Sequence, residues 1–260
     1  MMASISTTKH SPLQKLQQKE VLYKIFSTLL ILLIWQIVAS VVDREMIIPA
    51  PTATYQEMIR IMSEPNFFLI IGNTVKRALI GFLIALFAGI TLGVPAGYSK
   101  TFYNFLKPLV LINRAVPTMA IILLALIWLD SERAPVLVGF VVIFPILYES
   151  IVQGIRNVDS KLIEMMDLYD IKGFSRFKDL YLPSLASYLQ SGMIAAMGLN
   201  LKIIVAAEVL SQPALSIGTS FQIERVYLNT AGVFAWAFIT IILAAILEGG
   251  LELFHVKKRS

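Results

Sequence analysis

Residues 73–98 read NTVKRALIGFLIALFAGITLGVPAGY, and this stretch indicates the class of fold. After Lys76 and Arg77 it is apolar for about 20 residues, which is the length that an α-helix needs to cross a bilayer. Small residues let two helices approach closely in lipid, so a regular stripe of them predicts a tight seam with another helix. The seam could be static packing, which is the common case, or it could slide during transport. The stripe consists of Gly81, Ala85, Gly89, Gly93 and Gly97.

The composition of the whole chain agrees with a membrane location. The chain has 260 residues, of which 57% are hydrophobic and only 15% are charged, and its mean hydropathy is +0.75. Soluble domains carry about 25% charged residues. A soluble enzyme and a disordered chain are therefore both disfavoured. The absence of Cys excludes disulfides, thiolate nucleophiles and Cys-based metal sites.

The sequence predicts an all-α, polytopic membrane protein with about six transmembrane helices. The first span is too long for the core of a signal peptide and has no cleavage site after it, so we expect it to be retained. The polar ends are expected to be tails at 1–24 and 255–260, on either side of a membrane domain at 25–254. The six apolar stretches lie at about 25–42, 73–98, 106–129, 135–153, 184–209 and 231–253.

The distribution of Lys and Arg predicts the orientation. If both termini are cytoplasmic, the inner segments carry 14 of these residues and the outer loops carry 4. Such an excess on the cytoplasmic side is typical of membrane proteins. The net charge of +5 is therefore interpreted as a topology signal and not as a nucleic-acid-binding surface. Bends are expected at Pro95, Pro117 and Pro145, because proline removes a backbone hydrogen bond from a helix.

Ionisable and polar residues inside spans are candidates for a translocation pathway. A charge in the membrane is costly unless it is paired or hydrated, so such residues are functional candidates. The structural alternative is an ion pair, or a long side chain that reaches the headgroups. The candidates are Lys202, Asn200, Arg114 and Glu208, with Glu149 as a further charge in the fourth span.

A polar segment at 154–183 separates the fourth and fifth spans. It reads GIRNVDSKLIEMMDLYDIKGFSRFKDLYLP, with apolar residues at helical spacing. Asp159 is predicted to cap a first helix, Gly173 to end or turn a helix, and Pro183 to lie in the first turn of the next span. A short amphipathic pair of helices needs a partner for its apolar face, either the membrane surface or another protein.

This segment resembles the EAA loop of ABC importer permeases, whose pattern is E-A-A-x3-G-x9-I-x-L-P. Glu164 falls on the glutamate, Met165 and Met166 on the two alanines, and Asp170 on the glycine. Leu180 takes the place of the isoleucine, and Leu182 and Pro183 complete the pattern without a gap. The bulky methionines and Asp170 depart from the pattern, which leaves the local turn geometry open. Gly173 could supply the flexibility of the missing glycine.

The resemblance extends from about residue 47 to most of the chain and favours the nitrate/sulfonate/taurine branch. IIPAP at 47–51, the stretch at 73–99, NVDSKLIEMM at 157–166 and the acidic Glu208 each match that branch. The resemblance implies a type I importer permease fold in the cytoplasmic membrane of a prokaryote. It also implies four kinds of partner: an ABC ATPase subunit, a second permease copy, an extracytoplasmic substrate-binding protein and the lipid bilayer.

The resemblance also implies that the loop couples transport to ATP hydrolysis on the separate subunit. The cargo would be a small solute, such as a sulfonate, taurine, nitrate or similar anion, although some relatives carry vitamins or their precursors. The coupling residues would be Glu164, Met165, Met166, Asp167, Asp170, Ile171, Gly173 and Phe174.

The sequence contains no motif for catalysis. It has no G-x-x-x-x-G-K-[ST] for ATP binding, and its histidines are His10 and His255, in the tails. We therefore expect no catalytic residue, metal site or cofactor. The alternative function is a secondary transporter driven by an ion gradient. Such transporters typically show internal repeats with broken helices, and no repeat of that kind is visible here.

Overall fold

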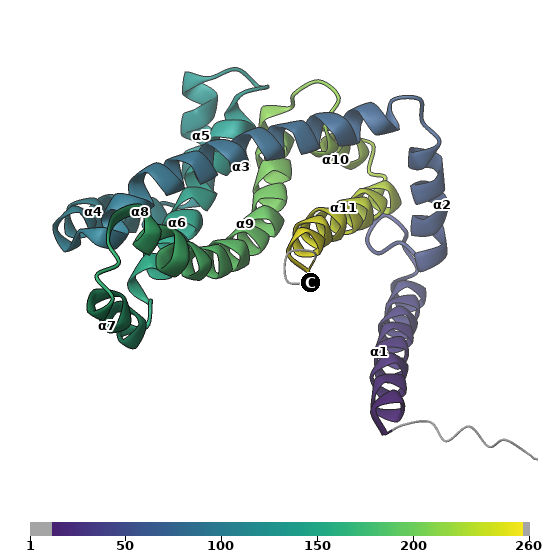
Figure 1. The fold of residues 1–260 in the computed structure, drawn as a ribbon. Coiled ribbons are helices and arrows are strands. Elements are labelled where there is room, and N and C mark those ends of the chain that lie inside the picture. The colour runs from purple at the N-terminus through teal and green to yellow at the C-terminus, as the bar shows by residue number, and fades with distance from the viewer. Residues whose placement is uncertain (1–11, 257–260) are drawn as a thin grey trace, which may run out of the picture.

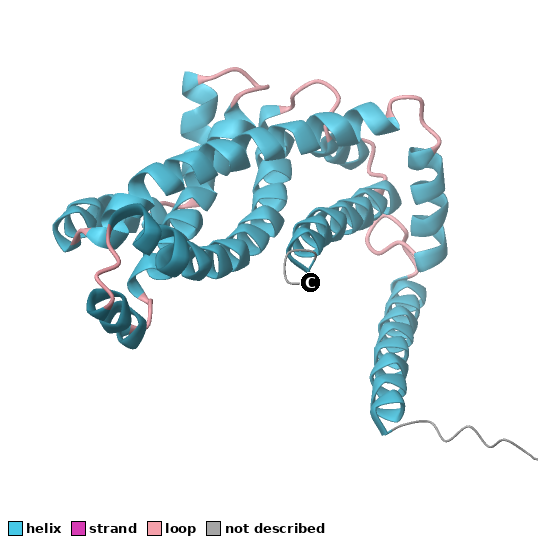
Figure 2. Ribbon diagram, viewed as in Figure 1, coloured by secondary structure: helices cyan, strands magenta, loops and turns pink. Residues whose placement is uncertain are grey.

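The computed structural model describes residues 12–256 and the side chains of residues 22–251. The described part is helical throughout, as predicted (Figures 1 and 2). Residues 1–11 and 257–260 of the expected tails, His10 among them, lie outside the described residues. The elements are α1 (Pro12–Val42), α2 (Pro51–Met62), α3 (Phe67–Tyr98), α4 (Lys100–Ala115), α5 (Thr118–Trp128), α6 (Ala134–Arg156), α7 (Ser160–Leu168), α8 (Gly173–Arg176), the π-helix η1 (Phe177–Tyr181), α9 (Leu182–Ser211), α10 (Ile217–Val226) and α11 (Thr230–Val256).

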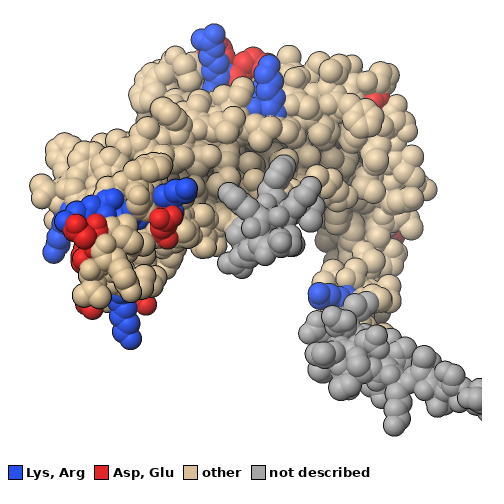
Figure 3. Space-filling model, viewed as in Figure 1, with Lys and Arg blue, Asp and Glu red and all other residues tan. Residues whose placement is uncertain are grey.

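Within residues 12–256, five helical stretches are long and apolar enough to cross a membrane. They are Leu22–Val42, Phe67–Tyr98, Ala134–Arg156, Gly173–Ser211 and Thr230–Leu251. The chain is therefore a multi-pass membrane protein. Figure 3 agrees with this, because on the face it shows a broad band without charges separates charged side chains at opposite ends.

The expected span at 106–129 is not one continuous helix. It is divided between α4 and α5, which are bent by 96° at a short break and give a sixth span only if the pair is counted as one. The bend expected at Pro117 is present, and it divides the predicted span into two helices. Pro117 explains the break, because proline disfavours helical geometry in the residue before it, and Val116 is extended.

The helices α3, α6 and α9 form the centre of the bundle. The stripe of small residues on α3 lies against α6, where the two backbones come close. A β-carbon added to Gly93 would lie 2.9 Å from the side chain of Ile151, and one added to Gly97 would lie 2.7 Å from that of Ile155. Larger residues at these positions would force the two helices apart.

Asn200 joins the three central helices at one buried point. Its Nδ2 donates a hydrogen bond to the carbonyl of Ala78 on α3, with a distance of 2.7 Å. On the other side, a β-carbon on Gly139 of α6 would lie 2.6 Å from Asn200 Oδ1. A glycine on α6 is therefore what makes room for the amide of α9.

The first helix contributes little to this bundle and extends away from it (Figure 1). Only 6% of its apolar stretch is buried. Trp35 provides its anchor: the indole stacks on Phe234 and Phe238, and Nε1 donates a hydrogen bond to the carbonyl of Pro49. Most of the apolar surface of α1 is therefore left for contacts outside the chain.

Arg156 connects the end of α6 to the end of α3. The last carbonyls of a helix have no partner within the helix, and basic side chains often bind them. Arg156 donates to the carbonyl of Ala96 at 2.8 Å, and its guanidinium lies 4.1 Å from the centre of the Tyr103 ring on α4. Three helix ends are thus held together just before the polar segment begins.

Candidate functional site

The polar segment predicted to couple the chain to a partner forms α7 and α8, which lie beside the ends of the spanning helices (Figure 1). Asp159 caps α7, since its Oδ1 accepts a hydrogen bond from the backbone N–H of Lys161 at 2.9 Å. This confirms the predicted start of the helix. Asp167 on α7 pairs with Arg176 of α8 at 2.6 Å, which holds the two short helices together.

The face of α7 and α8 that points away from the rest of the chain carries exposed apolar side chains. Leu168 is 84% exposed, Tyr169 is 70% exposed, and Phe174 on α8 is 77% exposed. Glu164 and Met165 are also exposed. An apolar surface of this kind, rimmed by charges, indicates a contact with another molecule. Met166 differs from the other candidates because it is buried, so its side chain is turned toward the rest of the chain.

The end of α7 explains why Asp170 occupies the position of a family glycine. The N–H of Ile171 donates to the carbonyl of Met166, and the N–H of Asp170 donates to that of Asp167. These two bonds define a Schellman motif, which requires a left-handed residue where glycine is usual. Asp170 adopts that conformation, with φ of 51°. Aspartate tolerates the left-handed region better than most residues, so the turn is kept without glycine.

Two further features of the turn concern Gly173 and Lys172. Gly173 also has a positive φ, of 63°, and so supplies a second left-handed residue, at the start of α8. Ile171, between the two turns, is partly buried. Lys172 forms an exposed ion pair with Asp170. The loop between α7 and α8 is therefore built from two left-handed residues three positions apart.

The exposed segment continues directly into a spanning helix. α8, η1 and α9 form one helical stretch from Gly173 to Ser211. Pro183 lies in the first turn of α9, as predicted. The π-helical turn lies directly before it, with the N–H of Leu182 donating to the carbonyl of Phe177. A displacement of α8 would thus be transmitted to α9 without a flexible linker between them.

The four pathway candidates lie in two kinds of environment. Lys202 and Arg114 are exposed on the single chain, whereas Asn200 and Glu208 are fully buried. Among the described residues, Lys202 makes no hydrogen bond or ion pair. Arg114 donates to the carbonyl of Pro145 on α6 at 3.3 Å and has no carboxylate partner within the described chain.

Glu208 belongs to a buried network at the opposite end of the bundle from α7. Its Oε1 lies 2.8 Å from Nη1 of Arg77, and its Oε2 accepts hydrogen bonds from Thr74 and from the N–H of Gly218. Glu132, in the α5–α6 loop, binds the other side of Arg77 at 2.5 Å. The network therefore joins α3, α9, the α5–α6 loop and the start of α10.

This network was not predicted from the sequence. Glu208 was expected among the pathway residues, and no partner was expected for Arg77. A usable signal was present, since Arg77 and Glu208 both lie near the ends of their spans that are remote from α7, and hence at similar depth. With three partners already bound, the Glu208 carboxylate has little capacity to bind a cargo. No group of three or more His, Asp and Glu side chains lies close enough to hold a metal ion in the part of the chain that the structure describes.

Residues 81–259 match the family described as binding-protein-dependent transport system inner membrane component. The chain belongs to this family. The match covers more than two thirds of the permease and includes α7, α8 and every spanning helix from α6 onward.

Several curated relatives assign the permease to a branch of the family. It is 25% identical to the taurine transport system permease protein of Escherichia coli K12 over 246 residues, 90% of this chain and 87% of that protein. It is 30% identical over 220 residues (84% and 81%) to an E. coli K12 protein provisionally named as an aliphatic sulfonates transport permease. It is 29% identical over 167 residues (64% and 58%) to the nitrate import permease protein of Leptolyngbya laminosa. The chain is an ABC importer permease of the nitrate/sulfonate/taurine branch.

Proposed function

We propose that this permease, with a second copy of itself, forms the import pathway for a small sulfonate-, taurine- or nitrate-type anion. A separate ABC ATPase subunit drives the cycle by docking on α7 and α8, and an extracytoplasmic binding protein delivers the cargo. Both termini lie in the cytoplasm. The bilayer is that of the prokaryotic cytoplasmic membrane.

The exposed apolar face of α7 and α8 is the observation that carries the coupling proposal. Leu168 and Phe174 are largely uncovered, although the stretch that bears them is held in shape by the Asp159 cap and the Asp167–Arg176 pair. A shaped, apolar and partly acidic surface suits a protein partner. The uninterrupted helical connection to α9 supports a mechanism in which movement of the docked ATPase tilts a spanning helix.

Two observations support an anionic cargo. The relatives described above carry names that refer to taurine, aliphatic sulfonates and nitrate. Lys202 and Arg114 are exposed cationic side chains within or beside spans, and neither has a carboxylate partner in the described chain. Unpaired cations in a membrane protein are typical of a pathway for negatively charged solutes.

Charge reversal at Glu164 tests the coupling proposal. Glu164→Arg should reduce both assembly with the ATPase and stimulation of its activity, while membrane insertion stays normal. Leu168→Ser should also reduce assembly and stimulation, because it removes part of the exposed apolar surface. Leu168 is 84% exposed, so the substitution does not disturb the packing of the chain itself. ATPase stimulation in reconstituted complexes is the measurement.

Glu45→Arg is the matched control for this test. Glu45 is exposed in the loop after α1, at the expected outer side, so reversing its charge should leave the coupled ATPase activity unchanged. Normal ATPase coupling in both Glu164→Arg and Leu168→Ser would remove the docking assignment.

Removal of the Lys202 charge tests the pathway. Lys202→Ala should lower the uptake of taurine, an alkanesulfonate or nitrate by about tenfold or more, since one charge-assisted contact contributes about 1.5–3 kcal/mol. Assembly with the ATPase should not change. Lys100→Ala is the control, because Lys100 is exposed at the very start of α4, before the predicted apolar stretch at 106–129. Uptake at the normal rate by Lys202→Ala would contradict the placement of Lys202 in the pathway.

A further inference from the structure

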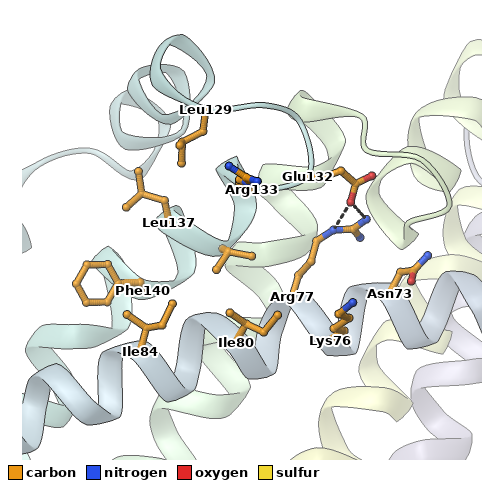
Figure 4. A pocket seen from close by; sticks show the side chains of 11 residues that line it. Asn73, Lys76, Arg77, Ile80, Ile84, Leu129, Glu132, Arg133, Leu137 and Phe140 are labelled. Carbon is orange, nitrogen blue, oxygen red and sulfur yellow. Dashed lines mark hydrogen bonds and ion pairs between the residues drawn. The ribbon is translucent and has the colours of Figure 1, made fainter.

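A cavity of about 620 Å³ lies beside the buried network, between α3, the end of α5 and α6 (Figure 4). Its charged and polar residues come from the outer part of α3 and from the α5–α6 loop, and its apolar residues come mainly from α3 and α6. The cavity is partly open to the surroundings of the chain. The lining consists of Asn73, Lys76, Arg77, Ile80, Ile84, Leu129, Glu132, Arg133, Val136, Leu137 and Phe140.

The cavity is polar at one end and apolar at the other. In Figure 4 Asn73, Lys76 and Arg77 lie toward one end of the α3 wall, while Ile84 and Phe140 lie toward the other. Lys76, Ile80 and Ile84 are spaced four residues apart, so they lie on one face of α3. The site therefore has the profile of an amphiphile with a polar head and an aliphatic chain.

The depth of Lys76 in the membrane follows from the sequence of α3. Residues 78–99 contain no Asp, Glu, Lys or Arg. At about 1.5 Å per residue these 22 residues extend about 33 Å, close to the hydrocarbon thickness of about 30 Å. Lys76 is therefore at the level of the outer headgroups. Ile80 and Ile84 lie about 6 and 12 Å deeper, at the level of the acyl chains.

The hydrogen-bonding state of the charged residues identifies the free donors. The guanidinium of Arg77 already binds the carboxylates of Glu208 and Glu132. Both carboxylate oxygens of Glu132 accept hydrogen bonds, one from Arg77 and one from the N–H of Ala214. Lys76 makes no hydrogen bond or ion pair with any described residue. Arg133 has a 77% exposed side chain and one loose ion pair, with Asp130 at 3.5 Å.

We propose that this cavity binds an anionic phospholipid of the outer leaflet. The phosphodiester oxygens accept hydrogen bonds from Lys76 and Arg133, with Arg133 exchanging its loose contact to Asp130 for the lipid. One acyl chain lies along Ile80, Ile84 and Phe140. The lining carries three cations and one carboxylate, which favours a negatively charged headgroup over a neutral one.

A lipid suits the cavity better than a free anion does. A sulfonate or phosphate ion could bind the same two cations, but it would leave the apolar lining uncovered. A bound lipid would also contact both α3 and the α5–α6 loop, which the Arg77 network already holds together. The choice of leaflet rests on the orientation given under Proposed function, but the site itself does not depend on the coupling role of α7 or on the identity of the cargo.

Lipid titration of the purified full chain tests the proposal. The chain is stripped of lipid in detergent, dioleoyl phosphatidylglycerol is added, and the bound lipid is counted by native mass spectrometry. Lys76→Gln and Arg133→Gln should each weaken binding about tenfold, the loss of roughly one charge-assisted hydrogen bond. Arg225→Gln removes an exposed charge of α10 outside the cavity and should bind as the unaltered chain does.

A second pair of variants tests the acyl-chain part of the site. Ile84→Trp fills the apolar end and should weaken phosphatidylglycerol binding, whereas Leu83→Trp should not, because the neighbouring Leu83 is 58% exposed and does not line the cavity. Both substitutions are at exposed positions, so folding is expected to persist in each.

Three outcomes would overturn the proposal. The first is equal retention of phosphatidylglycerol by the unaltered chain and the Lys76→Gln/Arg133→Gln double variant. The second is equal binding of dioleoyl phosphatidylcholine, which would remove the anionic selectivity. The third is displacement of the lipid by millimolar inorganic phosphate or ethanesulfonate, which would assign the site to a free anion.

Discussion

The charged residues at the two ends of the molecule are organised in opposite ways. At the end remote from α7, which is the outer end in the proposed orientation, Arg77 and Glu208 are buried and joined to each other and to Thr74 and Glu132. At the inner end, the charges of α7 and α8 are mostly exposed, and their pairs, such as Asp167 with Arg176, are local. The difference indicates that the outer network fixes the arrangement of the chain itself, while the inner segment presents a surface to something else.

Breaking the outer network should have the largest effect on stability. Arg77→Met leaves the Glu208 carboxylate buried without its cation, and loss of one partner of a buried pair costs about 3–5 kcal/mol. The midpoint of thermal unfolding in detergent should fall clearly. Arg176→Met, which breaks the exposed inner pair, should change it little, because exposed ion pairs contribute little.

The double variant Arg77→Met/Glu208→Leu tests whether the loss of stability comes from the unpaired Glu208 carboxylate. If the cost comes from the unpaired carboxylate, removing that carboxylate should restore a large part of the lost stability. Equal midpoints for Arg77→Met and Arg176→Met would contradict the contrast between the two ends.

The turn after α7 should be stabilised by restoring the family glycine. Asp170→Gly relieves the left-handed conformation of a residue with a β-carbon and should raise stability by about 0.5–1 kcal/mol. Asp167→Gly, in the last turn of α7, should lower stability, because it removes the ion pair with Arg176 and because glycine is a poor helix former. Thermal unfolding of the two variants gives the comparison. A fall in stability with Asp170→Gly would mean that the ion pair between Asp170 and Lys172 stabilises the turn by more than the left-handed conformation of Asp170 destabilises it.

The smallest effect is expected from acid at the junction of α2 with α10 and α11. Arg60 binds Glu57 and Glu224, with Glu64 also in reach, and Asn229 donates a hydrogen bond to Glu57. Burial raises the pKa of Glu57, but the hydrogen bonds from Arg60 and Asn229 outweigh it and hold the pKa below its ordinary value of 4.5. The contribution of Glu57 is therefore present at neutral pH and is lost as the pH falls below about 4.5.

The pH dependence can be measured by hydrogen exchange in residues 51–62. These residues should exchange faster below the ordinary pKa of Glu57, and Glu57→Gln should show a weaker dependence on pH. The difference in stability should be less than about 1 kcal/mol, because the pair is partly exposed. An identical pH dependence in Glu57→Gln would assign the acid effect to other carboxylates.

Much of the fold followed from local patterns in the sequence. The all-α class, five of the six apolar stretches, the Asp159 cap and the position of Pro183 depend on residues close together in the chain, and each was correct. A bend at Pro117 in the third stretch was also expected, but hydropathy does not predict the angle at which the second helix continues. Val116 and Pro117 indicated a bend, but its size of 96° depends on how α5 packs against α6.

The candidate site was predictable only in part. The resemblance to the EAA loop was enough to propose Glu164 and Phe174 as docking residues, but the burial of Met166 could not be predicted, because it depends on which residues lie behind α7. Likewise, Asp170 looked like a departure from the family, and only its φ of 51° shows that it keeps the turn of the glycine it replaces.

The sequence by itself determined that the chain crosses a membrane, and it led to the proposals of how its ends lie and which segment faces a partner. These properties follow from apolar length, charge placement and short motifs, which involve neighbours along the chain. The tertiary structure decided that Arg77 binds Glu208, that the stripe of small residues meets α6, and that Lys76 opens onto an amphipathic cavity. Those properties depend on which helix faces join, because pairing and burial arise between residues more than 50 positions apart, such as Arg77 and Glu132.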